Sequence, residues 1–192
     1  MRISRQAARR AAVLLLAAFV TELIAALCGS APLLRAEMLV LMAAAYGMNA
    51  VAAYWLKSWT ALAASLAGCA LAVLLPGGTN PAWIGNITVN LLYLAIYLPM
   101  QAALGRSLGE ADVSRGTLTL GRRWAVTLLV GRFLSSAAYL LSELYGVQQG
   151  SRLFGLQLVL EIAALVAVFA SYVYMVRYLW RARTLLAEQE GL

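Results

Sequence analysis

Three charged residues stand inside long apolar stretches of the sequence: Glu22, Arg132 and Glu161. A charge at the centre of a lipid bilayer costs about 2.5–3.5 kcal/mol on the insertion scale, so such residues commonly mark a site for an ion, a proton or a polar substrate. If the stretches are membrane-spanning helices, these residues lie about 16, 12 and 18 Å from the inner face, near the bilayer midplane. We therefore expect Arg132 to pair with Glu161, with Glu22 or with both. The alternative is a structural clamp between three helices.

Two acids and one base leave a net negative charge in such a cluster. An ionised carboxylate is costly to bury without a partner, so one protonated glutamate would relieve the imbalance. A glutamate that gains and loses a proton inside the membrane is what a proton-coupled carrier requires. Glu22 is the candidate for this role.

Smaller polar residues accompany the charges at helical spacing. Gln157 lies one turn before Glu161 on the same helix face, and Ser136 lies one turn after Arg132. Arg132, Glu161, Glu22, Gln157 and Ser136 therefore form the candidate site for a substrate or ion. Further polar residues near the same core are expected to make interhelical hydrogen bonds worth about 0.6–2 kcal/mol each: Asn49, Asn90, Gln101 and Ser135.

Several kinds of catalytic site are excluded by residues that the sequence lacks. It contains no histidine, which removes Ser-His and Cys-His nucleophile pairs and histidine-ligated metals. The phosphate-binding patterns GxxxxGK[ST] and GxGxxG are absent, as is the GxSxG nucleophile elbow. Cys28 and Cys69 read as packing residues. We expect no catalytic residue, no metal and no cofactor, and an enzyme would need polar groups converging at headgroup depth.

The composition places these residues in an integral membrane protein. Of 192 residues, 63% are hydrophobic and 12% are charged, whereas soluble domains carry about 25% charged residues. The net charge is +7, but the basic residues lie between apolar runs, so nucleic-acid binding is not expected. Six segments are long enough to cross a bilayer. They predict an all-α bundle of six transmembrane helices in one domain, residues 1–192, with spans at 11–28, 36–56, 59–75, 87–104, 124–145 and 153–176.

The positive-inside rule orients this bundle with both termini in the cytoplasm. That orientation places 12 of the 15 basic residues inside: Arg2, Arg5, Arg9, Arg10, Lys57, Arg106, Arg115, Arg122, Arg123, Arg177, Arg181 and Arg183. Tryptophan prefers the membrane–water interface, and Trp55, Trp59, Trp124 and Trp180 fall at predicted inner ends. The first span also resembles a signal peptide, whose cleavage would leave five spans. Its length and Glu22 favour its retention.

Two short stretches give the layout a family likeness. The tryptophan-led Trp124-Ala125-Val126 and the closing run Tyr172-Val173-Tyr174-Met175-Val176-Arg177 resemble features of the small bacterial septation protein A family. That family would show a lysine-proline-threonine element near the fourth span, where this chain has Asn86-Ile87-Thr88. No residue role is carried over from the resemblance.

Two functions follow from the sequence as expectations. One is a small transporter or channel-like subunit with a central Arg/Glu site, favoured by a water-accessible cavity reaching Arg132 and Glu161. The other is a non-catalytic scaffold or subunit of a cell-envelope complex, favoured by a sealed ion pair and an exposed face of small residues. The arginine-rich, lysine-poor composition indicates a bacterial cytoplasmic (inner) membrane. Expected partners are anionic lipid headgroups at the cytoplasmic face and a second subunit or copy of the chain.

Overall fold

The computed structural model describes residues 3–29, 35–74, 82–109, 115–145 and 152–188. These residues form six helices and contain no strand, which confirms the all-α expectation. The helices are α1 (Arg5–Gly29), α2 (Arg35–Trp55), α3 (Trp59–Leu74), α4 (Ala82–Gly109), α5 (Arg115–Tyr145) and α6 (Arg152–Glu188). Five of them are long and apolar enough to cross a membrane. α3 has 16 residues and spans about 24 Å, less than the roughly 30 Å of a bilayer core.

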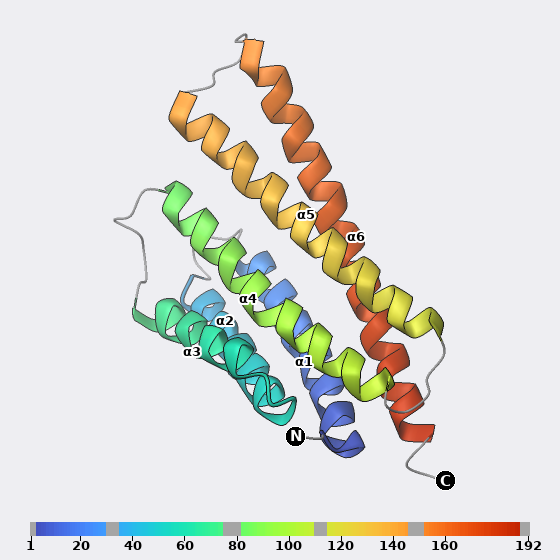
Figure 1. Cartoon of the computed structure of the whole chain (residues 1–192). Coiled ribbons are helices and arrows are strands. Elements are labelled where there is room, and N and C mark those ends of the chain that lie inside the picture. The colour runs from blue at the N-terminus through green and yellow to red at the C-terminus, as the bar shows by residue number, and fades with distance from the viewer. Residues whose placement is uncertain (1–2, 30–34, 75–81, 110–114, 146–151, 189–192) are drawn as a thin grey trace.

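The helices alternate in direction, so both chain termini lie at the same end of the bundle (Figure 1). The most extensive contacts are α5 with α6, α1 with α2, and α2 with α3. The start of α1, the α2–α3 turn, the end of α4, the start of α5 and the end of α6 all lie at the terminal end. These segments carry most of the basic residues, so one end of the bundle is strongly cationic.

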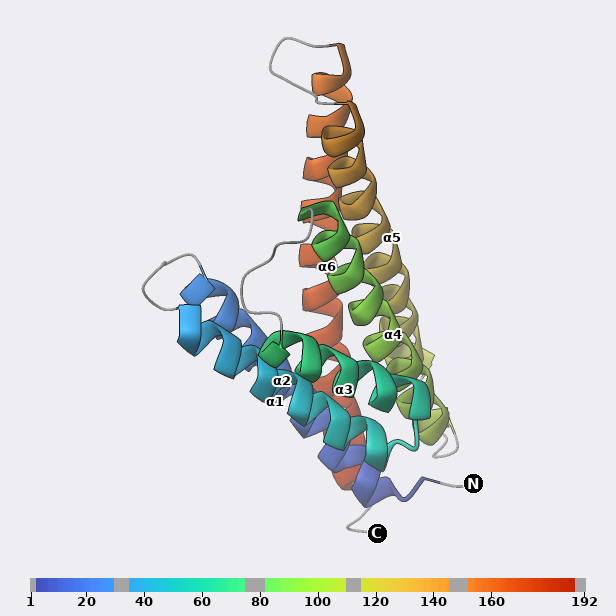
Figure 2. The ribbon, with the colours of Figure 1, turned by 90° about the vertical axis from the view of Figure 1, so that its left-hand side faces the viewer.

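The bundle is tightly packed at the terminal end and spreads toward the other end. Viewed from the side, α1, α2 and α3 lean away from α5 and α6 (Figure 2). The fully buried large side chains belong to the terminal half and include Leu15, Leu56, Leu104, Trp124 and Tyr178. In the spread half, apolar side chains of α5 and α6 such as Phe133 and Leu165 are largely exposed. Among the described residues, the bundle therefore has a continuous packed core at the terminal end and lacks one in the spread half.

Four helices extend well past the predicted spans, and α1 begins at Arg5 instead of at residue 11. The stretch from Gly105 to Arg123 reads as a charged loop in the sequence, but α4 continues to Gly109 and α5 begins at Arg115. α6 runs on to Glu188, beyond the predicted end at residue 176. The physical reason is that hydropathy marks only the hydrocarbon layer. Arginine, leucine and alanine are good helix formers, so the helices continue beyond the apolar segments.

The turn between α2 and α3 is set by backbone hydrogen bonds. Lys57 adopts a left-handed conformation with φ of 53°. The amide of Ser58 donates to the carbonyl of Ala53 at 2.9 Å, and that of Lys57 donates to Tyr54 at 3.0 Å. This 6→1 and 5→2 pattern is a Schellman helix end, in which the left-handed residue is usually glycine. The motif separates two apolar segments that nearly run together in the sequence.

Small residues allow two close helix contacts within the chain. A Cβ added at Gly131 of α5 would lie 2.9 Å from the backbone nitrogen of Val168 on α6. A Cβ at Gly68 of α3 would lie 2.7 Å from the ring of Tyr46 on α2. Ala61 and Ser65, one row of small residues in α3, are fully buried. These residues therefore pack within the monomer.

Trp124 differs from the sequence expectation. Its side chain is 1% exposed and stacks between Tyr97 and Tyr178, with ring centroids 6.2 and 5.7 Å away. It is a core residue and not an interfacial anchor. Trp180, by contrast, is 58% exposed near the end of α6. Local sequence cannot separate the two cases, because both tryptophans flank arginines.

Candidate functional site

Glu22 lies on the buried face of α1. The residues buried along this helix recur at three- and four-residue intervals, and the carboxylate continues the series near its far end: Ala8, Ala11, Ala12, Leu15, Ala18, Glu22 and Ala25. This periodicity is that of a helix face turned to a core. All other members are apolar, so the helix directs its single acid into the interior of the bundle.

Three side chains from two other helices donate hydrogen bonds to the Glu22 carboxylate. Oε1 accepts from the hydroxyl of Tyr97 at 2.8 Å and from Nδ2 of Asn49 at 3.2 Å. Oε2 accepts from the hydroxyl of Tyr93 at 2.7 Å. Tyr93 and Tyr97 are one turn apart on α4 and so share a face. Bonds to an ionised carboxylate are the strong class of hydrogen bond, and three of them offset part of the cost of burial.

Asn49 joins the same network from α2. It is fully buried, and its Nδ2 also donates to the hydroxyl of Tyr97 at 3.2 Å. Its Oδ1 is buried and accepts no hydrogen bond within the described part of the chain. Beside Glu22 there is a small cavity of about 10 Å³, lined by residues of four helices: Phe19, Glu22, Tyr93, Tyr97, Trp124, Leu128, Tyr172 and Met175. This volume is about that of one water position.

Arg132 of α5 approaches the network from the other side of Tyr93. Its guanidinium carbon lies 3.9 Å from the centroid of the Tyr93 ring, the geometry of a cation–π contact. Its terminal nitrogens donate to Oδ1 of Asn90 and to the hydroxyl of Tyr172, both at 3.2 Å. Its Nε is buried and donates no hydrogen bond to the described residues. The arginine thus binds neutral oxygens and an aromatic face.

Tyr93 therefore connects the base to the acid. Its ring carries the Arg132 guanidinium and its hydroxyl donates to Glu22. We expect from the sequence that Arg132 pairs directly with Glu161, Glu22 or both. In the structure, Glu22 is linked to Arg132 through Tyr93 instead, because the ring of Tyr93 lies between the two charged groups.

Ser136 and Asn90 support the arginine. Nδ2 of Asn90 donates to the hydroxyl of Ser136 at 2.9 Å and to Oδ1 of Asn86 at 3.0 Å. These bonds fix the amide so that its oxygen faces Arg132. Ser136 thus contributes to the site by orienting Asn90.

A surface groove between α5 and α6 reaches Arg132 from outside the bundle. It has a volume of about 300 Å³ and is lined by Arg132, Ser135, Ala138, Tyr139, Glu161, Ala164, Leu165 and Val168. Glu161 is exposed, and its Oε1 accepts from Nε2 of Gln157 at 2.8 Å. Arg132 and Glu161 therefore line one groove from opposite helices, while Glu22 lies in the interior. The five candidate residues therefore divide between an interior part, which contains Glu22, and a groove part, which contains Glu161. Arg132 lines the groove and is linked to Glu22 through Tyr93.

Three tyrosines belong to the site in the structure but are not among the candidate residues identified from the sequence. Tyr93, Tyr97 and Tyr172 supply most of the contacts to the two charges. A signal for them exists, because tyrosine concentrates at membrane interfaces and these residues lie inside predicted spans. A hydroxyl at that depth needs a partner, and a buried carboxylate accepts hydrogen bonds from such donors.

Within the described ranges, no three His, Cys, Asp or Glu side chains come together as a metal site would require. Comparisons of the chain with protein families, with curated proteins and with solved structures find no match. The geometry of the site is therefore the basis on which a function is proposed.

Proposed function

We propose that the chain is a small proton-coupled membrane carrier for a small polar or ionic solute. In this proposal the five long helices and the shorter α3 make six passes through the bacterial inner membrane. The cationic terminal end of the bundle faces the cytoplasm, in accordance with the positive-inside rule. The tightly packed terminal half closes the pathway on that side, and the spread half faces outward.

One observation carries the proposal. Arg132 lines a groove that opens at the protein surface, and the same guanidinium stacks on the tyrosine that binds the buried Glu22. A solute in the groove would therefore contact Arg132 directly, and a proton on Glu22 would affect the same arginine through Tyr93. The groove also reaches Glu161, so Arg132 and Glu161 are open to the surface of the protein and are not a sealed pair.

Glu22 is suited to hold a proton because its partners tolerate both protonation states. Tyrosine hydroxyls donate and accept, so Tyr93 can accept a hydrogen bond from a protonated Glu22 if its own hydroxyl rotates. The adjacent cavity has room for about one water, which would be the immediate proton donor or acceptor for Glu22. Neutralising Glu22 removes the anion on one side of the Tyr93 ring and alters the balance of charge around Arg132.

The groove has features that suit a polar solute. Arg132 presents a cation from α5, Glu161 an anion from α6, and Ser135 and Tyr139 add hydroxyls. Opposite charges on two walls bind the two ends of a small dipolar solute.

The test uses proteoliposomes that contain a pH-sensitive dye. Amino acids, monocarboxylates and monovalent cations are supplied in turn, and solute-driven changes in internal pH are recorded. We expect at least one class to drive proton movement, and Glu22→Gln to abolish it with the fold intact. Glu161→Gln should weaken the solute dependence. Glu143→Gln is the matched control, because Glu143 is an exposed acid of α5 outside the site.

A second candidate is a scaffold or subunit of a cell-envelope complex. The observation that favours it is the exposed apolar surface of the α5–α6 hairpin in the spread half, including Phe133, Leu165 and Phe169. Another subunit, a second copy or lipid would cover this surface. If no solute class moves protons through the folded protein, the carrier proposal fails and this candidate takes its place.

A further inference from the structure

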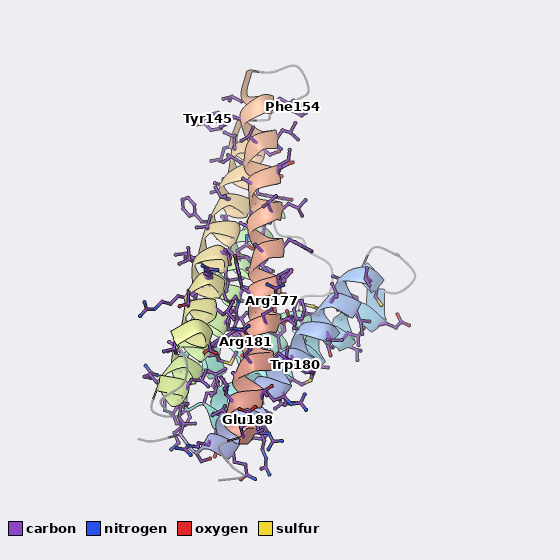
Figure 3. All side chains as sticks on the ribbon, turned by 90° about the vertical axis from the view of Figure 1, so that its right-hand side faces the viewer. Tyr145, Phe154, Arg177, Trp180, Arg181 and Glu188 are labelled. Atoms are coloured by element: carbon purple, nitrogen blue, oxygen red, sulfur yellow. The ribbon has the colours of Figure 1, made fainter. Side chains whose placement is uncertain are left out.

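A second groove lies at the cationic end of the bundle, away from the proposed transport site. It has a volume of about 530 Å³ and is lined by Leu120 of α5 and by Val176, Arg177, Trp180 and Arg181 of α6. No acidic side chain is among these lining residues. Figure 3 shows Arg177, Trp180 and Arg181 together on the lower part of α6.

The two arginines lie on one face because they are four residues apart in a helix. Both are exposed, and each guanidinium presents a planar fork of donors that matches a phosphate. Trp180 stands beside them, 58% exposed. The guanidinium carbon of Arg183 lies 5.2 Å from the centroid of its indole ring, which steadies the tryptophan at the groove.

The other two lining residues are apolar. Leu120 is half-buried and Val176 is 37% exposed. The groove therefore combines a paired cationic site, an amphipathic aromatic ring and an apolar wall. A ligand with an anionic phosphate and a hydrocarbon chain matches all three features, whereas a free phosphate would use the arginines alone.

We propose that this groove between α5 and α6 binds the headgroup of an anionic phospholipid, with Arg177 and Arg181 on the phosphate and Leu120 and Val176 along the acyl chain. The site is independent of the proposed transport function. It adds a specific lipid position to the general attraction that a cationic surface exerts on anionic membranes. At typical strengths of arginine near a membrane surface, two arginines favour an anionic over a zwitterionic lipid by about 30-fold.

Trp180 provides the probe. The full chain is reconstituted into mixed vesicles of phosphatidylglycerol and phosphatidylcholine, with bromine on the acyl chains of one lipid or the other. Quenching of tryptophan fluorescence is measured for the unchanged protein and for Trp180→Phe. The difference between the two is the quenching of Trp180, which lies at this groove. We expect brominated phosphatidylglycerol to quench this part far more strongly than brominated phosphatidylcholine.

The variants separate a built site from diffuse surface charge. Arg177→Gln with Arg181→Gln should bring the preference toward parity, whereas the paired lysine substitutions should keep most of it. Arg122→Gln with Arg123→Gln is the matched control, because these exposed arginines lie at the same end of the bundle outside the groove. Circular dichroism verifies the fold of each variant.

Three results would overturn the inference. Equal quenching by both lipids means that the groove does not select an anionic headgroup. Equal loss of preference in the two glutamine pairs means that general charge, and not this groove, attracts the lipid. Inorganic phosphate that removes the preference without any change in ionic strength means that the ligand is a free phosphate.

Discussion

Substitution of Tyr93 by phenylalanine tests the central link of the candidate site. The change removes the hydroxyl that donates to Glu22 at 2.7 Å, and it keeps the ring that lies 3.9 Å from the Arg132 guanidinium. The acid and the base are thereby disconnected with almost no change in volume. No other single-atom deletion in the network is as selective.

The expected magnitude follows from the type of bond. Interhelical hydrogen bonds in membranes contribute about 0.6 kcal/mol on average and at most about 1.7. Bonds to charged groups in soluble proteins contribute about 1.5–3 kcal/mol. The Tyr93–Glu22 bond is short and its acceptor is a buried carboxylate, so we expect a coupling free energy of about 1–2 kcal/mol if Glu22 is ionised. A value near the membrane average indicates a neutral Glu22.

The assay is a double-mutant cycle of Tyr93→Phe and Glu22→Leu. The free energy of unfolding is measured by titrating SDS into detergent micelles and following helix content by circular dichroism. The cycle isolates the pairwise free energy, because the partners that each single variant leaves behind cancel. Tyr54→Phe is the control: Tyr54 is 60% exposed, so its loss of a hydroxyl should change stability by less than about 0.5 kcal/mol.

The outcome that refutes the reasoning is a coupling free energy below about 0.3 kcal/mol, half the membrane average. Tyr93 and Glu22 would then be neighbours without a productive bond. The shared action of Arg132 on groove and carboxylate would lose its physical basis, whatever the transport assay showed.

Further substitutions test the packing of the bundle. Gly131→Ala should lower the unfolding free energy by about 1–3 kcal/mol, because its Cβ would meet the backbone of α6. Gly47→Ala, with nothing within 4 Å, should leave thermal stability in detergent unchanged or raised. Lys57→Gly should raise the unfolding free energy by about 0.5–1 kcal/mol by relieving the left-handed backbone, and an unchanged melting temperature contradicts this account. Trp124→Phe should remove fluorescence that is less accessible to acrylamide than the fluorescence that Trp180→Phe removes; the reverse order contradicts the burial of Trp124.

The sequence by itself determined that the chain is all-helical and where most helices run. Apolar length and turn residues sufficed, because each helix satisfies its own backbone hydrogen bonds and needs no partner to be recognised. The even alternation of helices, with both termini at one end, also followed from the pattern of apolar runs. Hydropathy did not determine where the helices end, since charged residues beyond the apolar layer continue them.

The sequence also singled out Glu22 and Arg132, because an ionised group in an apolar stretch is conspicuous wherever its partners lie. The identity of the partners was decided by tertiary structure. Asn49, Tyr93 and Tyr97 reach Glu22 from helices 27 to 75 residues away along the chain, and the rotation of each helix about its axis selects which residues face inward. Glu161 was equally conspicuous, yet the rotation of α6 turns it to the surface.

The tyrosine bridge shows most clearly what only packing could decide. A direct Arg–Glu pair is what charge alone predicts, because opposite charges attract at any orientation. The crossing of α4 between α1 and α5 places the ring of Tyr93 in that position, where it binds the anion with its hydroxyl and the cation with its face. That position is set by side-chain volumes and helix crossing, and no periodicity in a single helix encodes it.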